Sequence, residues 1–209
     1  MLITAINANS RRNGRFDVVI DGSVAATLSI ETIERLQLKV GAPVDERLDA
    51  VLQREAALVA TYDRALNMLA LRARSAAELR RLLIRKKEPA DLVDPTIDRL
   101  LRAGFLDDGS FARQFARSKL LGAGLSRRRV QQELARRGVA RDVAESALAD
   151  VVSEEHVDEE DGLQRVAKKK LKSLERLDPA VQRRRLYAFL ARRGYDSDDI
   201  ARTLRELTG

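Results

Sequence analysis

The chain has 209 residues, of which 44% are apolar and 34% are charged, while only 4% are aromatic and Trp is absent. It contains no Cys and a single His, which excludes disulfides, thiolate nucleophiles and Cys-ligated zinc and leaves almost no basis for a catalytic triad. The formal net charge of +7 predicts a negatively charged partner, either nucleic acid or an acidic protein surface.

The first 60 residues predict a small β-meander followed by a helix, which we take as one domain (1–60). Asn13-Gly14 and Asp21-Gly22 are expected to form the two hairpin turns, because these residue types tolerate positive φ. Three short strands are marginal alone, so a short helix at 30–38 should cover one face. Residues 44–71 then read as helix leading into the next domain. The strands are expected at 2–6, 15–20 and 24–28.

From about residue 61 the sequence repeats itself. Three segments match when they are aligned on Leu83, Leu134 and Leu190, at spacings of 51 and 56 residues. Each has apolar residues at helical spacing and then two cations. Three matches at near-regular spacing predict three tandem units, which we place at 61–107, 108–152 and 153–209.

Each unit is expected to contain three helices. Ser75 and Ser126 are typical N-caps for the middle helices, and Asp94-Pro95 is expected to begin the third helix of the first unit. The fold class is therefore mainly α, with three tandem three-helix repeats forming an elongated, curved body behind a small β-meander. The helices are expected at 61–72, 76–86 and 95–103, then at 109–121, 127–137 and 141–151, then at 161–174, 179–192 and 198–207.

An acidic segment at 154–161 separates the second and third units, with six acids in eight residues. It predicts either a flexible joint or the acidic first turn of a helix, where the helix dipole favours negative charge. We favour the helix, because lysines follow about two turns later. These are Lys168, Lys169, Lys170 and Lys172.

No motif indicates an enzyme. Phosphate-binding and dinucleotide-binding glycine loops are absent. Asp107-Asp108 is interpreted as a helix cap rather than a metal pair, with Phe105 and Leu106 packed beneath the joint, and His156 is expected to be exposed. We therefore expect no catalysis, no cofactor and no metal. The lack of a signal-peptide pattern and of an apolar run near ~20 residues predicts a cytoplasmic protein.

The basic clusters carry the functional signal. Residues 61–152 hold 19 basic and 12 acidic residues, and this middle part carries the excess charge. Cations at 127–129 open a helix, where each opposes the dipole by about 0.3–1 kcal/mol, so an external use is favoured over an ordinary solvated face. If the units stack in register, the clusters form one basic stripe. The candidate residues for binding a partner or DNA are Arg80, Arg81, Arg85, Lys86, Lys87, Arg127, Arg128, Arg129, Arg136, Arg137, Arg183, Arg184, Arg192 and Arg193.

The aromatic residues fall mostly at apolar helical positions, where we expect them to be core residues, as for Phe105 and Tyr187. Few aromatics remain as stacking platforms for bases. Any contact with nucleic acid should therefore be directed at the phosphate backbone, sensitive to salt and poor in sequence specificity.

The string Gly104-Phe105-Leu106-Asp107-Asp108, together with the residues that follow it, resembles the central signature of the RecX family, bacterial regulators of the RecA recombinase. Residues 65–69 with Arg74-Ser75 and Glu78-Leu79 resemble that family's first repeat. The resemblance covers 61–209 well and 1–60 more loosely. The residues that follow the string are Phe111-Ala112, Phe115-Ala116, Gly124, Val130, Leu134 and Arg137-Gly138-Val139.

The resemblance implies a non-enzymatic monomer that binds in the groove of the RecA–DNA filament and inhibits or disassembles it, modulating recombination, DNA repair and the SOS response. Single- and double-stranded DNA would be bound weakly through phosphates. The link at 87–94 carries extra residues, and the third unit has a long acidic lead and lacks an expected Trp. The alternative function is a general, sequence-independent nucleic-acid-binding helical protein that uses the same basic stripe.

Overall fold

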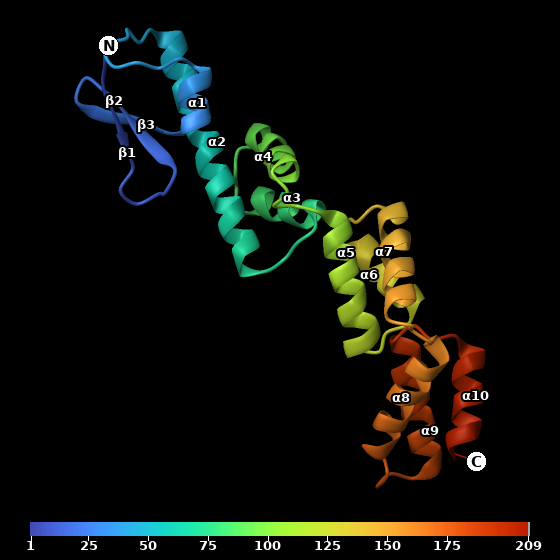
Figure 1. Ribbon diagram of the computed structural model, residues 1–209. Coiled ribbons are helices and arrows are strands. Elements are labelled where there is room, and N and C mark those ends of the chain that lie inside the picture. Colours follow the sequence, from blue (N-terminus) through green and yellow to red (C-terminus); the bar gives the residue numbers. More distant parts are fainter. Residues whose placement is uncertain (209) are drawn as a thin grey trace. The chain divides into compact units, whose positions relative to one another are not determined.

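The structure is a computed structural model that describes residues 1–208, and it is mainly helical with one small sheet (Figure 1). Two compact units are formed, one from residues 1–73 and 79–105 and the other from 74–78 and 106–209. The helices are α1 (Ile30–Arg35), α2 (Glu46–Leu71), α3 (Ala76–Arg85), α4 (Ala90–Arg102), α5 (Asp108–Arg117), α6 (Arg127–Arg136), α7 (Arg141–Glu154), α8 (Glu159–Lys172), α9 (Pro179–Arg192) and α10 (Ser197–Thr208), with a π-helical turn η1 (Ser118–Gly122).

The three-stranded meander is confirmed. Strands β1 (Ile3–Ala8), β2 (Arg15–Ile20) and β3 (Ser23–Ser29) pair antiparallel in chain order. Asp21 and Gly22 form the second turn as predicted, with φ of 47° and 85°, because a two-residue hairpin needs both in the left-handed region.

Asn13 and Gly14 form a turn as predicted: the Arg15 N–H donates to the Arg12 carbonyl at 3.2 Å, and Gly14 has a φ of 70°. This turn is only the last part of a six-residue loop from residue 9 to residue 14, so the connection is longer than the expected tight hairpin. The chain also bends earlier in the loop. The Asn9 side-chain oxygen accepts hydrogen bonds from the backbone N–H groups of Arg11 and Arg12, at 2.9 and 2.8 Å, and turns the chain before Asn13.

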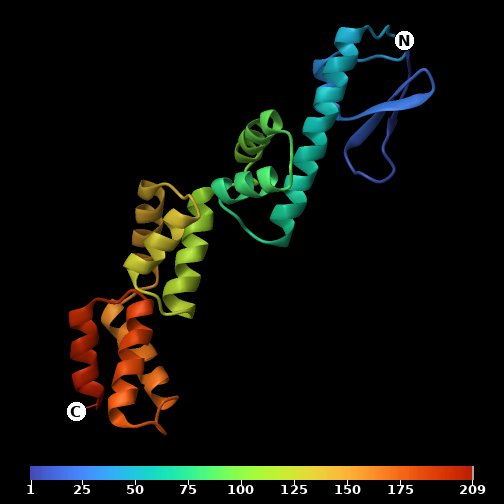
Figure 2. The same cartoon turned by 180° about the vertical axis from the view of Figure 1, so that it is seen from behind.

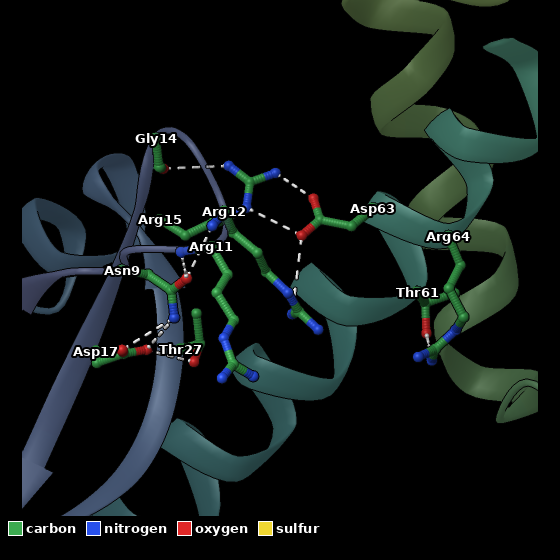
Figure 3. A network of polar contacts seen from close by, with 10 residues as sticks. All are labelled: Asn9, Arg11, Arg12, Gly14, Arg15, Asp17, Thr27, Thr61, Asp63 and Arg64. Atoms are coloured by element: carbon green, nitrogen blue, oxygen red, sulfur yellow. Dashed lines mark hydrogen bonds and ion pairs between the residues drawn. The ribbon is translucent and has the colours of Figure 1, made fainter.

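Polar contacts fasten this loop to the long helix α2 (Figure 3). The Asp63 carboxylate on α2 accepts hydrogen bonds from the Arg15 guanidinium. The Asn9 amide nitrogen donates to Asp17 at 2.9 Å, and the Thr27 hydroxyl donates to the same carboxylate at 2.6 Å. These two hydrogen bonds, the Thr27 bond first, hold the pKa of Asp17 below its ordinary value. Asp17 therefore stays charged and keeps Asn9 in place.

One helix serves both the sheet and the first repeat. Asp45 caps α2 by accepting from the Leu48 N–H at 2.7 Å, and the helix runs unbroken for 26 residues through residue 60. Near its start, Leu52 is buried in the sheet core with Val18 and Leu28, so α2 as well as the predicted helix after β3 covers the sheet. Later in the helix, Tyr62 is buried and the Arg99 guanidinium of α4 lies 4.8 Å from its ring.

The third helix of the first repeat does not begin at Asp94-Pro95. Helix α4 begins at Ala90, and Pro95 lies inside it. The earlier start buries Leu92 and Val93, which are 4% and 1% exposed. Burial of two apolar side chains outweighs the single backbone hydrogen bond that Pro95 cannot donate.

The second and third repeats follow the predicted order of three helices each, and their helices lie side by side in both views (Figure 1, Figure 2). Leu134 is fully buried in the α5–α7 core, and Leu190 is fully buried in the α8–α10 core. They are two of the three leucines on which the sequence repeat is aligned. In the second repeat, the helix expected at 109–121 is α-helical to Arg117 and then widens into the π-helical turn η1, which ends at Gly122.

Two further predictions concern the burial of apolar residues and the acidic segment. Leu106 is buried as predicted, but Phe105 is 59% exposed and Tyr187 is 41% exposed, so neither is a core residue. The acidic segment forms the first turn of a helix only at residues 159–161, as favoured, whereas residues 155–158 connect α7 to α8. Asp158 caps α8 by accepting from the N–H groups of Glu160 and Asp161, and lysines lie in its last turn.

Candidate functional site

The cations of helix α3 divide into engaged and free side chains. Arg80 forms an ion pair with Asp94 at 2.6 Å, and this hydrogen bond lowers the pKa of the Asp94 carboxyl. Arg81 is also engaged. In contrast, Arg85, Lys86 and Lys87 are exposed, and no side-chain hydrogen bond or ion pair joins them to any residue between 1 and 208. The C-terminal end of α3 therefore offers three cations to a partner.

The cations that open helix α6 have acceptors inside the protein. Arg127 lies 3.6 Å from the Glu159 carboxylate and donates to the Val157 carbonyl at 3.0 Å. Arg128 donates to the carbonyl of Gly194 at 3.2 Å. Arg129 forms an ion pair with Glu133 on the next turn, at 3.3 Å. The third repeat thus supplies acceptors for Arg127 and Arg128, which the sequence interpretation sought outside the chain.

Helices α6 and α9 meet end to end at this place. The Ser126 N–H, at the start of α6, donates to the carbonyl of Arg193, at the end of α9, with a distance of 3.0 Å. A helix C-terminus carries partial negative charge and an N-terminus partial positive charge, so the two ends attract. Arg128 benefits from the same carbonyl-rich end, which offsets the unfavourable dipole of its own helix.

The same arrangement occurs twice in the chain. We call the contact of α6 with the third repeat the second junction, and the contact of residues 74–78 with the second repeat the first junction. In the first junction the Ser75 hydroxyl donates to the carbonyl of Arg137 at 2.6 Å. Ser75 and Ser126 each lie eight residues before the aligned leucine, and Arg137 and Arg193 each lie three residues after it.

A carboxylate completes both junctions. The Ala76 N–H donates to Asp108 at 2.8 Å, and the Arg127 N–H donates to Glu159 at 3.1 Å. Each acceptor lies at the start of the first helix of the following repeat, Asp108 in α5 and Glu159 in α8. The equivalence between the repeats therefore includes the residues that connect one repeat to the next, in addition to the core leucines.

Two glycines allow the close approach at the second junction. Gly194 has a φ of 89°, and a Cβ added there would lie 2.5 Å from the Arg129 Cβ and 2.7 Å from the Ser126 hydroxyl. A Cβ on Gly124, whose φ is 59°, would collide with the Val166 side chain. Neither position can take a larger residue without moving its neighbours.

Tyr195 is buried at the second junction. It is 6% exposed, and its hydroxyl donates to the carbonyl of Gly124 at 3.2 Å. Burial, with a smaller effect of the Glu159 charge, raises the pKa of Tyr195 to about 12. The hydroxyl thus remains a hydrogen-bond donor throughout the neutral range.

The charges differ between the two junctions. In the first, the Arg137 guanidinium lies 4.6 Å from the centre of the Phe115 ring and forms an ion pair with Glu78 at 2.5 Å. In the second, the position equivalent to Glu78, three residues after the serine, is Arg129. Arg193 lies 4.4 Å from the centre of the Phe189 ring, and no residue within 1–208 accepts a hydrogen bond from its buried Nε.

The remaining predicted site residues lie on the third repeat and at the end of α6. Arg183 and Arg184, in the second turn of α9, and Arg192, at its end, are exposed and form no ion pair with the described residues. Arg136 is exposed but engaged. The structure brings Arg127, Arg128 and Arg129 close to the end of α9, whereas one continuous basic stripe along all three repeats stays a prediction.

Sequence reasoning did not select the lysines of α8 as site residues. Lys168, Lys169 and Lys172 are exposed and unpaired over the described part of the chain, and the Lys170 ammonium lies 5.5 Å from the centre of the Phe189 ring. Because these lysines lie at a helix end, the sequence interpretation explained them by the helix dipole alone. Only their position beside Arg193 distinguishes them from ordinary lysines at the end of a helix.

The acidic pair Asp107-Asp108 acts as interpreted. Asp107 accepts from the Ser110 N–H at 2.9 Å and caps α5, and these contacts with Ser110, the backbone one first, lower the pKa of Asp107. His156 is exposed, as predicted. Within residues 1–208 no group of three or more acidic or His side chains is placed to hold a metal ion, and no helix there is both long and apolar enough to cross a membrane.

Comparison with known proteins identifies the repeats. Family profiles described as the first, second and third three-helix domains of RecX match residues 62–100, 107–148 and 158–204. A solved structure titled "Crystal structure of regulatory protein RecX" shares the fold, with a TM-score of 0.78, 19% sequence identity and 98% of each chain covered.

Relatives from several bacteria carry the same name, regulatory protein RecX. The Mycolicibacterium smegmatis protein is 38% identical over 63% of this chain and 70% of its own length. The Pelodictyon phaeoclathratiforme protein is 35% identical over 68% and 86%, and the Clostridium botulinum protein is 28% identical over 98% and 95%. With all three domain profiles matched in order, the chain belongs to the RecX family of regulatory proteins.

Proposed function

We propose that this chain binds the RecA recombinase filament on DNA, in the filament's groove, and inhibits or disassembles it without catalysis of its own. Through that contact it would modulate recombination, DNA repair and the SOS response in the cytoplasm. The observation that carries the proposal is membership of the RecX family across all three repeats. Unpaired cations on the described repeats support it, because a filament on DNA presents phosphates and acidic side chains.

The cations best placed for the partner are those without acceptors inside the protein. Arg85, Lys86 and Lys87 are exposed together at the end of α3. Arg127 and Arg128, in contrast, are held by the third repeat. We therefore rank the end of α3 first among the proposed contacts, with Arg183, Arg184 and Arg192 next. The cations that already contact other residues of the protein complete the proposed set; these are Arg80, Arg81, Arg127, Arg128, Arg129, Arg136, Arg137 and, through the Phe189 ring alone, Arg193.

The test is the ATPase activity of RecA on single-stranded DNA with this protein titrated in. We expect inhibition by the parent chain, and at least about tenfold weaker inhibition, or roughly 1.4 kcal/mol, when Arg85, Lys86 and Lys87 are all changed to Gln. The melting temperature should stay within a few degrees, because these side chains touch no described residue through a polar contact. No inhibition by the parent chain at any ratio to RecA would refute the proposal.

A second candidate is general, sequence-independent nucleic-acid binding that uses the same cations. The unpaired arginines and lysines favour it, since they need only phosphates. Binding to DNA alone separates the two functions. The second candidate requires tight, steeply salt-dependent binding without RecA, whereas filament regulation requires inhibition at protein concentrations where DNA alone is scarcely bound.

A further inference from the structure

We propose that a cavity in the third repeat, beside the second junction, is a binding site for a phosphate group of the nucleic-acid backbone. The cavity has a volume of about 300 Å³, and its polar side chains are Lys169, Lys170, Ser173 and Arg193, with Phe189 at its wall. The turn of η1 closes it through Gly122 and Ala123. No carboxylate lies among the residues that line it.

The two junctions together show why this cavity needs an anion. At the first junction Arg137 lies on an aromatic ring and has Glu78 as its counter-ion. At the second junction the equivalent Arg193 lies on Phe189 in the same way, but the position of Glu78 is taken by Arg129. The second junction therefore has an arginine over an aromatic ring, as the first does, but a cation at the position where the first has a carboxylate.

Arg193 is held in place by two contacts that leave its Nε without an acceptor. Its backbone carbonyl accepts from the Ser126 N–H, and its guanidinium lies 4.4 Å from the centre of the Phe189 ring. The buried Nε finds no acceptor among residues 1–208. A buried donor without an acceptor is unfavourable, more so on a charged group, and an oxyanion bound in the cavity would supply the missing negative charge beside Arg193.

The surroundings favour a phosphate over a base. Phe189 is covered by two cations, Arg193 at 4.4 Å and Lys170 at 5.5 Å, so it serves as their support and is not a free stacking platform. Lys169 is exposed at the rim without an ion pair in the described part of the chain. Three cations around one cavity are suited to the oxygens of a phosphodiester.

The same helix favours a polyanion over a single acidic side chain. Lys168 and Lys172 lie outside the cavity on α8, exposed and unpaired with the described residues, and their Cα atoms are about 6 Å apart along the helix axis. Cations at this spacing are suited to a ligand that carries negative charges at regular intervals. The proposed ligand is therefore the backbone of DNA, of which one phosphate enters the cavity.

This inference rests on the proposed function only in taking DNA as a partner, and its test omits RecA. The binding of fluorescently labelled single-stranded DNA to the full chain is measured by anisotropy across a salt series. The variant carries Lys169→Gln and Lys170→Gln. We expect at least a tenfold loss of affinity and a fall of about 1.4 in the slope of log K against log salt, since each lost contact on a single strand contributes about 0.7.

The matched control carries Arg176→Gln and Arg205→Gln, which remove the same two charges from exposed, unpaired positions of the third repeat. We expect a change below about twofold. Lys169→Gln alone, at an exposed side chain, keeps the test decisive if the double variant does not fold. Circular dichroism melting of each variant reports folding.

Equal losses in the two double variants, or full affinity in the cavity variant, would overturn the inference. Inorganic phosphate or a polyglutamate peptide, each compared with chloride at equal ionic strength, identifies other sources of the anion. If either binds in a way that depends on Lys169 and Lys170 while DNA binding does not, the site is for a small anion or an acidic peptide instead. If the cavity variant loses DNA affinity but still inhibits RecA, the inference is supported and the filament contact does not depend on this cavity. If the parent chain binds DNA but does not inhibit RecA, the proposed function fails while the inference stands.

Discussion

The two junctions share a geometry and differ in charge. Each places the N-terminus of a middle helix on the C-terminus of the next one, with a serine and an acidic residue at equivalent positions. The first pairs Glu78 with Arg137 inside the protein, whereas the second has Arg129 at that position and leaves Arg193 without a carboxylate. The same helix-end contact therefore occurs once with an internal ion pair and once without one.

We expect the largest loss of stability at the second junction from a substitution of Gly194. Gly194→Ala adds a Cβ against Arg129 and Ser126 and also holds Ala at a φ of 89°, so we expect a loss of about 2–4 kcal/mol in the free energy of unfolding. Urea unfolding measures it, and hydrogen exchange at the Ser126 N–H reports the junction itself.

Gly104→Ala is the control for that variant. Gly104 has a φ of 73°, but a Cβ there meets nothing within 4 Å, so only the backbone strain of about 1 kcal/mol should appear. If both glycine variants lose the same stability, close approach is not what the second junction requires.

The charge difference can be tested at equivalent positions. Glu78→Gln leaves Arg137, of which the side chain is 28% exposed, without its carboxylate, and we expect a loss of about 2 kcal/mol. Arg129→Gln breaks only a partly exposed pair with Glu133 on its own helix, so its effect should stay within about 0.5 kcal/mol. Thermal unfolding of both variants side by side decides this. A larger loss for Arg129→Gln would contradict the proposed charge asymmetry.

The smallest effect is expected at the end of α3, where Lys87 occupies the position of Gly138 and Gly194 in the repeat. All three have a positive φ, 62° at Lys87, 82° at Gly138 and 89° at Gly194. Lys87→Gly relieves the strain of a side chain in the left-handed region, so we expect a gain of about 1 kcal/mol or less. A rise in melting temperature would support this, and a fall would show that the lysine side chain contributes to the fold.

Much of the fold follows from local sequence signals. The aligned leucines, the serine N-caps and the Asp21-Gly22 turn are each specified by a few neighbouring residues, and helix order and the meander are confirmed. The start of α4 was misplaced because a local signal, Asp94-Pro95, competes with burial of Leu92 and Val93, which depends on tertiary packing. Phe105 was misplaced for the related reason that apolar character alone does not reveal which side of a joint faces solvent.

The candidate site was less accessible to sequence reasoning. Counting cations located the basic clusters, but whether an arginine is free depends on acceptors far along the chain, such as the Gly194 carbonyl for Arg128. The signal that was available is the repeat itself. Alignment on the leucines places Arg129 at the position equivalent to Glu78, and Arg193 at the position equivalent to Arg137. This difference in residue type indicates a changed contact before any coordinates are known.

Helix α2 has a mechanical consequence for the first unit. It is about 39 Å long at 1.5 Å per residue, and it is packed into the sheet core near one end and against α4 farther along. The helix is continuous between these two attachments, and the Arg15–Asp63 contact joins the start of β2 to α2 directly after Tyr62. A force on the hairpin loop would therefore be transmitted along the continuous helix α2 to the first repeat. The sheet and the first repeat should consequently move together as one body rather than as two flexibly linked parts.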